Sequence, residues 1–143
     1  MAARGSAQWR GDLKSGDGDL TVGDGVWSGP YSFKSRFEDG SGTNPEQLLA
    51  ASHAACFSMA LSAQLTEAGT PPTSISTDAR VQLRNVDGLP TITAIALKTV
   101  GEVPGLDAAG FAEQAQKAKA GCVISRAVTG VGEITLEAEL REG

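Results

Sequence analysis

Two cysteines are the residues of this sequence best suited to chemistry. Cys56 and Cys122 are the only cysteines among 143 residues, which is too few for a disulfide framework, and a reducing compartment would keep both as thiols between reaction events. A thiolate can be oxidised by a peroxide to a sulfenic acid, which a second thiol converts into a disulfide. The pair therefore suits two-step thiol redox chemistry, although each cysteine alone is equally consistent with a residue that only fills a core.

The same inventory argues against a metal centre and against a serine hydrolase. His53 is the only histidine, so the two cysteines and His53 are one ligand short of a closed structural zinc site, and no CxxC pair occurs. Without a second histidine or a nucleophile-elbow pattern, Ser52, Ser58 and Ser125 are not hydrolase candidates. We predict no metal and no cofactor, and we interpret His53 either as a packed residue or as part of a pocket lining.

Cys56 lies in a strongly apolar helical stretch, so its reactivity requires a nearby cation. Burial in apolar surroundings raises the pKa of a thiol, and an adjacent positive charge opposes that rise. Arg36 is the candidate because its segment leads directly into the turn before the helix. Its guanidinium would favour the thiolate and donate hydrogen bonds to a peroxide oxygen. Glu46 either fixes Arg36 through both carboxylate oxygens or interacts only with the helix dipole.

The sequence does not determine how the side chains of Arg36, Glu46 and Cys56 would come together. Ten positions separate Glu46 from Cys56, which is about 15 Å along a straight helix, and the two residues do not share a face. Either Arg36 spans the gap, or the helix breaks, or one group comes from the other subunit of a dimer.

The elements that must position these residues alternate between strands and helices. The central helix begins either with Asn44 as its N-cap and Pro45 at its first position, or with Thr43 as the cap and Glu46 closing a capping box. Gly69 ends the helix. Asp107 is the predicted cap of a second helix. This order gives an α+β fold in a single domain over residues 1–143. The expected elements are strands within 8–13, 19–22 and 31–37, a helix from 45 to 68, a hairpin of 75–83 and 91–100, a helix at 107–120 and a strand at 134–140.

The central helix is apolar on almost every side, and this pattern predicts that it is buried on most of them. Aromatic residues make up only 5% of the chain, so the core of one monomer is thin, and burial at a subunit interface would reinforce it. The apolar positions that recur at helical spacing are Leu48, Ala51, Ala55, Met59 and Ala63.

Net charge excludes several classes of partner. The formal charge of −5 repels phosphate backbones and anionic lipid headgroups, so we predict no nucleic-acid and no membrane partner. Residues 1–16 contain no apolar stretch that could serve as a signal-peptide core, and no segment is expected to span a membrane. We therefore predict a cytoplasmic protein.

A long motif around Cys56 resembles a known family. The stretch RFE at 36–38 and GTNPEQLLAASHAACFSMAL at 42–61 closely resembles the OsmC branch of the OsmC/Ohr family. WRGD at 9–12, PTSI at 72–75 and KAKAGC at 117–122 extend the similarity over nearly the whole chain. His53 favours the OsmC branch, because Ohr proteins tend to have tyrosine at this position.

The resemblance implies both a fold and an activity. The implied fold is an intertwined homodimer in which antiparallel sheets wrap long buried helices, with two active sites at the interface. The implied activity is reduction of organic hydroperoxides in oxidative and osmotic stress defence, with a lipoyl-type dithiol as reductant. Cys56 would attack the peroxide, Cys122 would resolve the sulfenic acid into a disulfide, and Arg36 and Glu46 would surround the thiolate.

Alternatives remain at two points. The Ohr branch presents its arginine from an earlier segment, so Arg4 or Arg10 could replace Arg36 as the cation. A redox-sensing binding protein could use the same disulfide to change its affinity for a partner, and a ligand-binding or structural module would leave both thiols inert. Steady peroxide turnover would separate the enzyme from the sensor, and slow alkylation of both thiols would favour the module.

Overall fold

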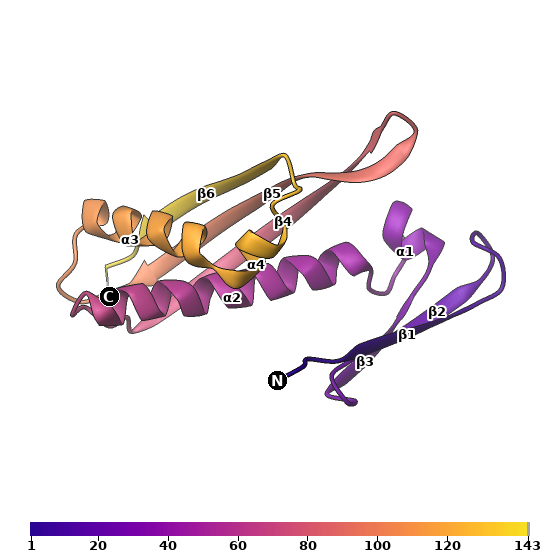
Figure 1. Cartoon of the computed structure of the whole chain (residues 1–143), viewed down its shortest axis with the longest axis horizontal. Coiled ribbons are helices and arrows are strands. Elements are labelled where there is room, and N and C mark those ends of the chain that lie inside the picture. The colour runs from indigo at the N-terminus through magenta and orange to yellow at the C-terminus, as the bar shows by residue number, and fades with distance from the viewer. Residues whose placement is uncertain (143) are drawn as a thin grey trace. The chain divides into compact units, whose positions relative to one another are not determined.

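The computed structural model describes residues 1–142 and confirms an α+β fold with two three-stranded sheets (Figure 1). The chain divides into two compact units, Met1–Leu48 and a second that begins at Leu49. That both units belong to one domain stays a prediction.

The first unit is built on an antiparallel sheet in the order β1-β2-β3. Its strands are β1 (Gly5–Arg10), β2 (Asp17–Val22) and β3 (Trp27–Tyr31). The Trp9 and Tyr31 rings pack at a centroid distance of 5.4 Å, which joins the two outer strands across the middle one. The second strand confirms the prediction from sequence, whereas the first overlaps the predicted range only at residues 8–10 and ends at Arg10.

The predicted strand over 31–37 is wrong, because residues Phe33–Phe37 form a short helix, α1. Ser32 caps this helix in a reciprocal box: the Ser35 N–H donates to Ser32 Oγ at 3.1 Å, and the Ser32 N–H donates to Ser35 Oγ at 2.8 Å. These local side-chain hydrogen bonds stabilise a helical turn despite the alternating pattern of the sequence. Arg36 therefore lies on a helix and not on a strand.

Helix α2 (Pro45–Glu67) runs without a break through the Cys56 motif. Of the two N-caps considered, Asn44 is the one observed, since the Gln47 N–H donates to Asn44 Oδ1 at 2.8 Å. At its C-terminal end Gly69 adopts a positive φ of 87°, and the Thr70 N–H donates to the Leu65 carbonyl at 2.9 Å. A residue with a Cβ would be strained at that φ, which is why glycine ends the helix.

Burial along α2 is confined to one row of side chains. His53, Phe57, Leu61 and Leu65 are fully buried, at the i, i+4 spacing of one helix face. The opposite apolar row of Ala51, Ala55, Met59 and Ala63 is exposed in the single chain. The expectation of burial on most sides is therefore wrong for the monomer, because only one face of α2 joins the core.

Helix α2 is also long and apolar enough to cross a membrane by length and composition, with a mean hydropathy of 1.3 over 18 residues. The expectation that no segment approaches a membrane span was too strict in this respect. A core helix of a soluble protein meets the same test, so the helix by itself is no sign of a membrane protein.

The second unit continues with a long hairpin and a crossover. Strands β4 (Ser74–Val86) and β5 (Leu89–Glu102) pair antiparallel through a turn at Asp87 (φ 52°) and Gly88 (φ 84°), as a two-residue turn requires. Helices α3 (Ala108–Gly121) and α4 (Val123–Ala127) then lead to β6 (Glu133–Leu140), which pairs parallel with β5. The hairpin, the Asp107 cap of α3 and the last strand confirm the prediction from sequence.

The core of the second unit joins α2, β5 and α3. Phe57 and Phe111 are its largest fully buried side chains. Aliphatic and small residues fill the remainder, as the low aromatic content predicts. The other buried members are Leu61, Leu65, Ile95, Leu97, Val103, Ala115, Ala118 and Cys122.

Candidate functional site

Cys56 stands on α2 immediately before the fully buried Phe57. The rotation of the helix by about 100° per residue turns Cys56 partly away from the core, and its side chain is half-buried at the edge of the apolar cluster. The Cys56 thiol is therefore packed against apolar groups and still reachable from solvent.

Cys122 occupies the junction between α3 and α4. Its N–H donates to the Ala118 carbonyl at 2.8 Å, which closes α3, and its own carbonyl accepts from the Arg126 N–H at 3.0 Å, which opens α4. Only 1% of Cys122 is exposed. The predicted location at a helix end is confirmed, and the residue is far more deeply buried than Cys56.

The two thiols lie next to each other within the second unit, and neither is in a disulfide. Burial raises the pKa of Cys122, but hydrogen bonds from the Ser125 N–H, the Cys56 thiol, the Ser125 hydroxyl and the Ile124 N–H together hold it below its usual value. The structure thus places the two residues that the sequence singled out in one part of the core, with Cys122 inside the apolar cluster and Cys56 packed against it.

His53 is a buried histidine with one partner. Its Nε2 lies 2.7 Å from Ser125 Oγ, while its Nδ1 is buried without a hydrogen-bond partner among residues 1–142. Burial lowers the pKa of His53, so the ring is neutral at neutral pH. Of the two interpretations that the sequence allowed, the packed histidine is the one observed.

Ser125 is the residue of this cluster that sequence reasoning missed. It was considered only as a hydrolase nucleophile, yet it contacts both His53 and Cys122. Its position three residues after Cys122 is the signal that could have found it, because the third residue of a helix lies beside the capping residue.

Arg36 and Glu46 form an ion pair in the first unit. Arg36 Nη2 lies 2.7 Å from Glu46 Oε1, and Arg36 Nε lies 3.1 and 3.3 Å from the two carboxylate oxygens. The Glu46 side chain is only 11% exposed, against 39% for Arg36. Of the two roles considered for Glu46, the structure shows the ion pair that fixes the guanidinium. The association of this pair with Cys56 stays a prediction.

The two alternative arginines already form ion pairs with aspartates of the first unit. Arg4 Nη1 lies 2.8 Å from Asp24 Oδ1. Arg10 contacts Asp17 at 2.7 Å and Asp19 at 2.8 Å, and its hydrogen bonds to Asp19 and Asp17 raise its pKa. Both arginines are exposed, so each pair contributes little to stability.

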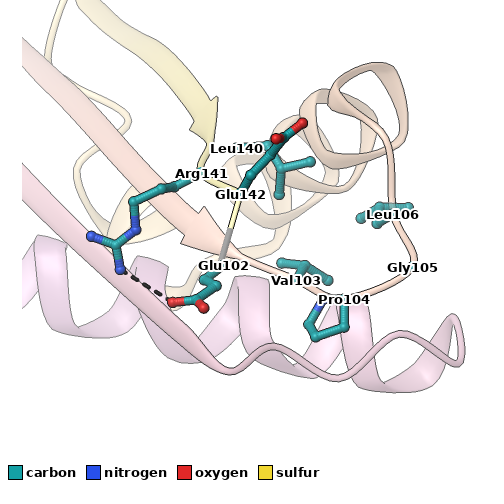
Figure 2. Close-up of a pocket in the computed structure, with 8 residues that line it drawn as sticks. All are labelled: Glu102, Val103, Pro104, Gly105, Leu106, Leu140, Arg141 and Glu142. Carbon is teal, nitrogen blue, oxygen red and sulfur yellow. Dashed lines mark hydrogen bonds and ion pairs between the residues drawn. The ribbon is translucent and has the colours of Figure 1, made fainter.

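No group of three His, Cys, Asp or Glu side chains within residues 1–142 is arranged to hold a metal ion. A hollow of about 320 Å³ opens beside the ends of β5 and β6 (Figure 2). Figure 2 shows its one cation, Arg141, reaching toward Glu102, with a distance of 3.2 Å between Nη2 and Oε2. No cysteine or histidine lines this hollow, so we do not assign the thiol chemistry to it.

Comparisons with known proteins identify relatives of this chain that are named for reactions with peroxides. Over 139 residues the chain is 52% identical to Peroxiredoxin OsmC of Escherichia coli strain K12, covering 96% of each chain. It is 36% identical over 98 residues to the Organic hydroperoxide resistance protein of Xanthomonas axonopodis pv. citri, covering 68% of this chain and 67% of that protein.

A solved structure has the same fold. The organic hydroperoxide resistance protein OhrB of Bacillus subtilis superposes with a TM-score of 0.71 at 27% identity, covering 99% of this chain and 98% of that one. The family model described as OsmC-like protein matches residues 38–137, a range that contains Glu46, Cys56 and Cys122. The chain therefore belongs to the family of OsmC-like proteins.

Proposed function

We propose that this chain is a two-cysteine thiol peroxidase that reduces organic hydroperoxides in stress defence, with Cys56 as the attacking thiol and Cys122 as the resolving thiol. The observation that carries the proposal is the contact between a half-buried Cys56 and a fully buried Cys122. The names of the relatives, a peroxiredoxin and an organic hydroperoxide resistance protein, support the same activity.

Unequal exposure supports the division of roles between the two cysteines. A hydroperoxide with a bulky organic group must approach the attacking sulfur from solvent, and only Cys56 is open to it. Cys122 is 1% exposed and contacts Cys56, so it is sheltered from the substrate and adjacent to the sulfenic acid that forms. Its lowered pKa suits a thiol that must react as the thiolate.

The reaction proceeds in two balanced steps. The Cys56 thiolate attacks the distal peroxide oxygen, the O–O bond breaks, and the departing alkoxide takes a proton to give an alcohol. Cys122 then attacks the sulfenic sulfur of Cys56, which forms the disulfide and releases water. A dithiol reductant, for which we favour the lipoyl type, reopens the disulfide by thiol exchange.

Arg36 and Glu46 complete the proposed site. A guanidinium held by two carboxylate oxygens keeps a fixed orientation, so Arg36 can stabilise a thiolate and the charge that develops on the peroxide. The site requires no metal or cofactor, and we propose a cytoplasmic location. A redox sensor would use the same disulfide without sustained turnover.

We expect sustained peroxide consumption when the protein is supplied with a dihydrolipoyl dithiol. Because the surroundings of Cys56 are apolar, cumene hydroperoxide should exceed hydrogen peroxide in kcat/KM by roughly tenfold or more. The measurement is a coupled steady-state assay with each peroxide, with glutathione as a monothiol control. A single stoichiometric oxidation without turnover would favour the sensor, and two thiols inert to peroxide would favour a structural module.

We also propose that the protein is a homodimer, with the exposed apolar row of α2 buried between subunits. Met59 is 76% exposed in a row that otherwise consists of alanines, and such a face gains free energy when a partner covers it. Sedimentation at micromolar concentration should give twice the monomer mass. Met59→Glu should shift the protein toward the monomer, whereas Ala112→Glu on the exposed side of α3 should not. A folded monomer of the parent chain would contradict the proposal.

A further inference from the structure

His53 and Ser125 form a buried polar pair that the proposed reaction does not yet use. They come from α2 and α4, and their side chains meet at 2.7 Å between Nε2 and Oγ. His53 is fully buried and Ser125 is 8% exposed. Burying two polar side chains in an apolar core is costly unless their hydrogen bonds are made. Because both side chains are buried, solvent water does not compete for their hydrogen bond, and the pair keeps a defined geometry.

The unpartnered nitrogen of His53 determines the direction of this hydrogen bond. Nδ1 has no partner among residues 1–142, and a buried donor left unpaired is rarer in proteins than a buried acceptor left unpaired. The favoured tautomer therefore leaves Nδ1 unprotonated and places the proton on Nε2. In that state the Nε2–H donates to Ser125 Oγ, and the serine proton is free to point elsewhere.

The remaining direction for the Ser125 proton is toward Cys122. Cys122 is the N-cap of α4 and Ser125 is its third residue, a spacing that sets the two side chains beside each other. A hydrogen bond from the Ser125 hydroxyl is among the causes that lower the pKa of Cys122. The hydroxyl that His53 holds is thus placed beside the resolving thiol, at the third position of the helix that Cys122 begins.

We propose that His53 is a positioning residue for the resolving thiol: its Nε2–H holds the Ser125 hydroxyl so that this hydroxyl donates its hydrogen bond to the Cys122 sulfur. The inference rests on the proposed function, because it assigns these residues to the second step of that reaction. Neither His53 nor Ser125 touches the peroxide in this scheme.

The step that gains from this arrangement is disulfide formation. The Cys122 thiolate attacks the sulfenic sulfur of Cys56, the S–S bond forms and the S–O bond breaks. The departing hydroxide takes the proton that the Cys122 thiol released, so water is the only other product. A hydroxyl aimed at Cys122 stabilises its thiolate before the attack, in the way that a hydrogen bond to a charged form favours that form.

The test measures Cys122 directly in a Cys56→Ser background, which removes the other titratable group in contact with it. The readout is the pH dependence of Cys122 alkylation by a small reagent after mild loosening with urea, recorded for each variant beside its circular dichroism spectrum. His53→Leu and Ser125→Ala should each move the alkylation profile to higher pH by about one unit, which is about tenfold in thiolate fraction. His53→Gln keeps a side-chain N–H donor and should restore most of the profile.

A matched control separates positioning from general loosening. Thr99 is fully buried on β5, where its hydroxyl pairs with Thr77 Oγ1 at 3.0 Å. Thr99→Val therefore removes a buried hydroxyl that hydrogen-bonds another threonine and should leave the profile unchanged. Profiles of His53→Leu and Ser125→Ala that coincide with the background would overturn the inference. So would an equal shift in Thr99→Val, or a His53→Gln profile displaced as far as that of His53→Leu. If His53→Leu does not fold, Ser125→Ala decides.

The same variants with Cys56 intact test the reaction step. After one equivalent of cumene hydroperoxide, the sulfenic acid of Cys56 should persist about tenfold longer in Ser125→Ala than in the parent. If the parent consumes no peroxide, the proposed function fails. The alkylation profiles still decide the inference in that event, because they require no substrate.

Discussion

Replacing Cys56 by serine is expected to abolish peroxide reduction, with a loss of roughly a thousandfold or more in turnover. The reason is chemical: a serine hydroxyl in apolar surroundings does not form the anion that attacks a peroxide. Replacing Cys122 by serine should have a different outcome. This variant should consume one equivalent of hydroperoxide and then stop, with sulfenic acid accumulated at Cys56, because the attacking thiol is intact and the resolving thiol is absent.

The measurement for the cysteine variants is peroxide consumption in a single mixing experiment, followed by trapping of sulfenic acid with a dimedone-type reagent and mass spectrometry of the modified peptide. Ser58→Ala is a suitable control, since its hydroxyl on α2 pairs with Thr77 Oγ1 at 2.8 Å and with neither cysteine. Sustained turnover by Cys56→Ser would show that another group attacks the peroxide. A trapped sulfenic acid at Cys122 would reverse the two roles.

Local signals in the sequence were sufficient for most elements of the fold. Asn44 and Asp107 cap the helices they were predicted to cap, and the Asp87-Gly88 pair makes the turn of the long hairpin. Each of these signals acts through neighbours only a few residues away, so a single sequence contains all the information needed to interpret it. The parallel pairing of β6 with β5 is a long-range property that no local pattern specifies.

The error at residues 31–37 has a specific physical cause. Alternation of aromatic and polar residues predicts a strand, but Ser32 and Ser35 offer the backbone a pair of hydrogen bonds that close a helical turn. Side-chain capping therefore outweighed periodicity over a segment too short for periodicity to be decisive. The consequence for the site is that Arg36 stands on α1, with its guanidinium 5.2 Å from the centroid of the Phe37 ring.

The sequence proposed the residues of the candidate site but could not specify their contacts. Cys56, Cys122, Arg36 and Glu46 were chosen from residue type and motif, and the structure pairs the cysteines with each other and the arginine with the glutamate. The His53–Ser125 contact joins residues 72 positions apart, so sequence spacing could not indicate it. The sequence also could not indicate that the His53 ring is buried, because a histidine in an apolar helix can face the core or the solvent.

Arg36→Met is expected to lower the peroxidase rate by about 100-fold to 1000-fold, on the scale of losing one donor that stabilises developing charge. Methionine has a similar length but neither the charge nor the planar fork. In a Cys122→Ser background, Arg36→Met should also move the pH profile of Cys56 alkylation to higher pH, because a thiolate without a nearby cation is less stable. Arg36→Lys keeps the charge and loses the fork. It should retain much of the thiolate fraction while losing rate with organic hydroperoxide.

Two further variants show whether Arg36 acts on the Cys56 thiolate or only stabilises the first unit. Each is measured for peroxidase rate and for the pH profile of Cys56 alkylation. Glu46→Gln removes the charge that holds the guanidinium at 2.7 Å and should resemble Arg36→Lys, with lowered rate and a partly retained profile. Arg80→Met removes an exposed arginine on β4 that pairs with Asp78 and should change neither readout.

Should Arg36→Met titrate and react like the parent, the cation beside Cys56 is another residue. Arg4 and Arg10 are then the residues to replace next, because an arginine from the first strand would match the Ohr-type arrangement. In that event the carboxylates that hold them, Asp24 for Arg4 and Asp17 with Asp19 for Arg10, would have to release the guanidinium for it to reach the thiolate.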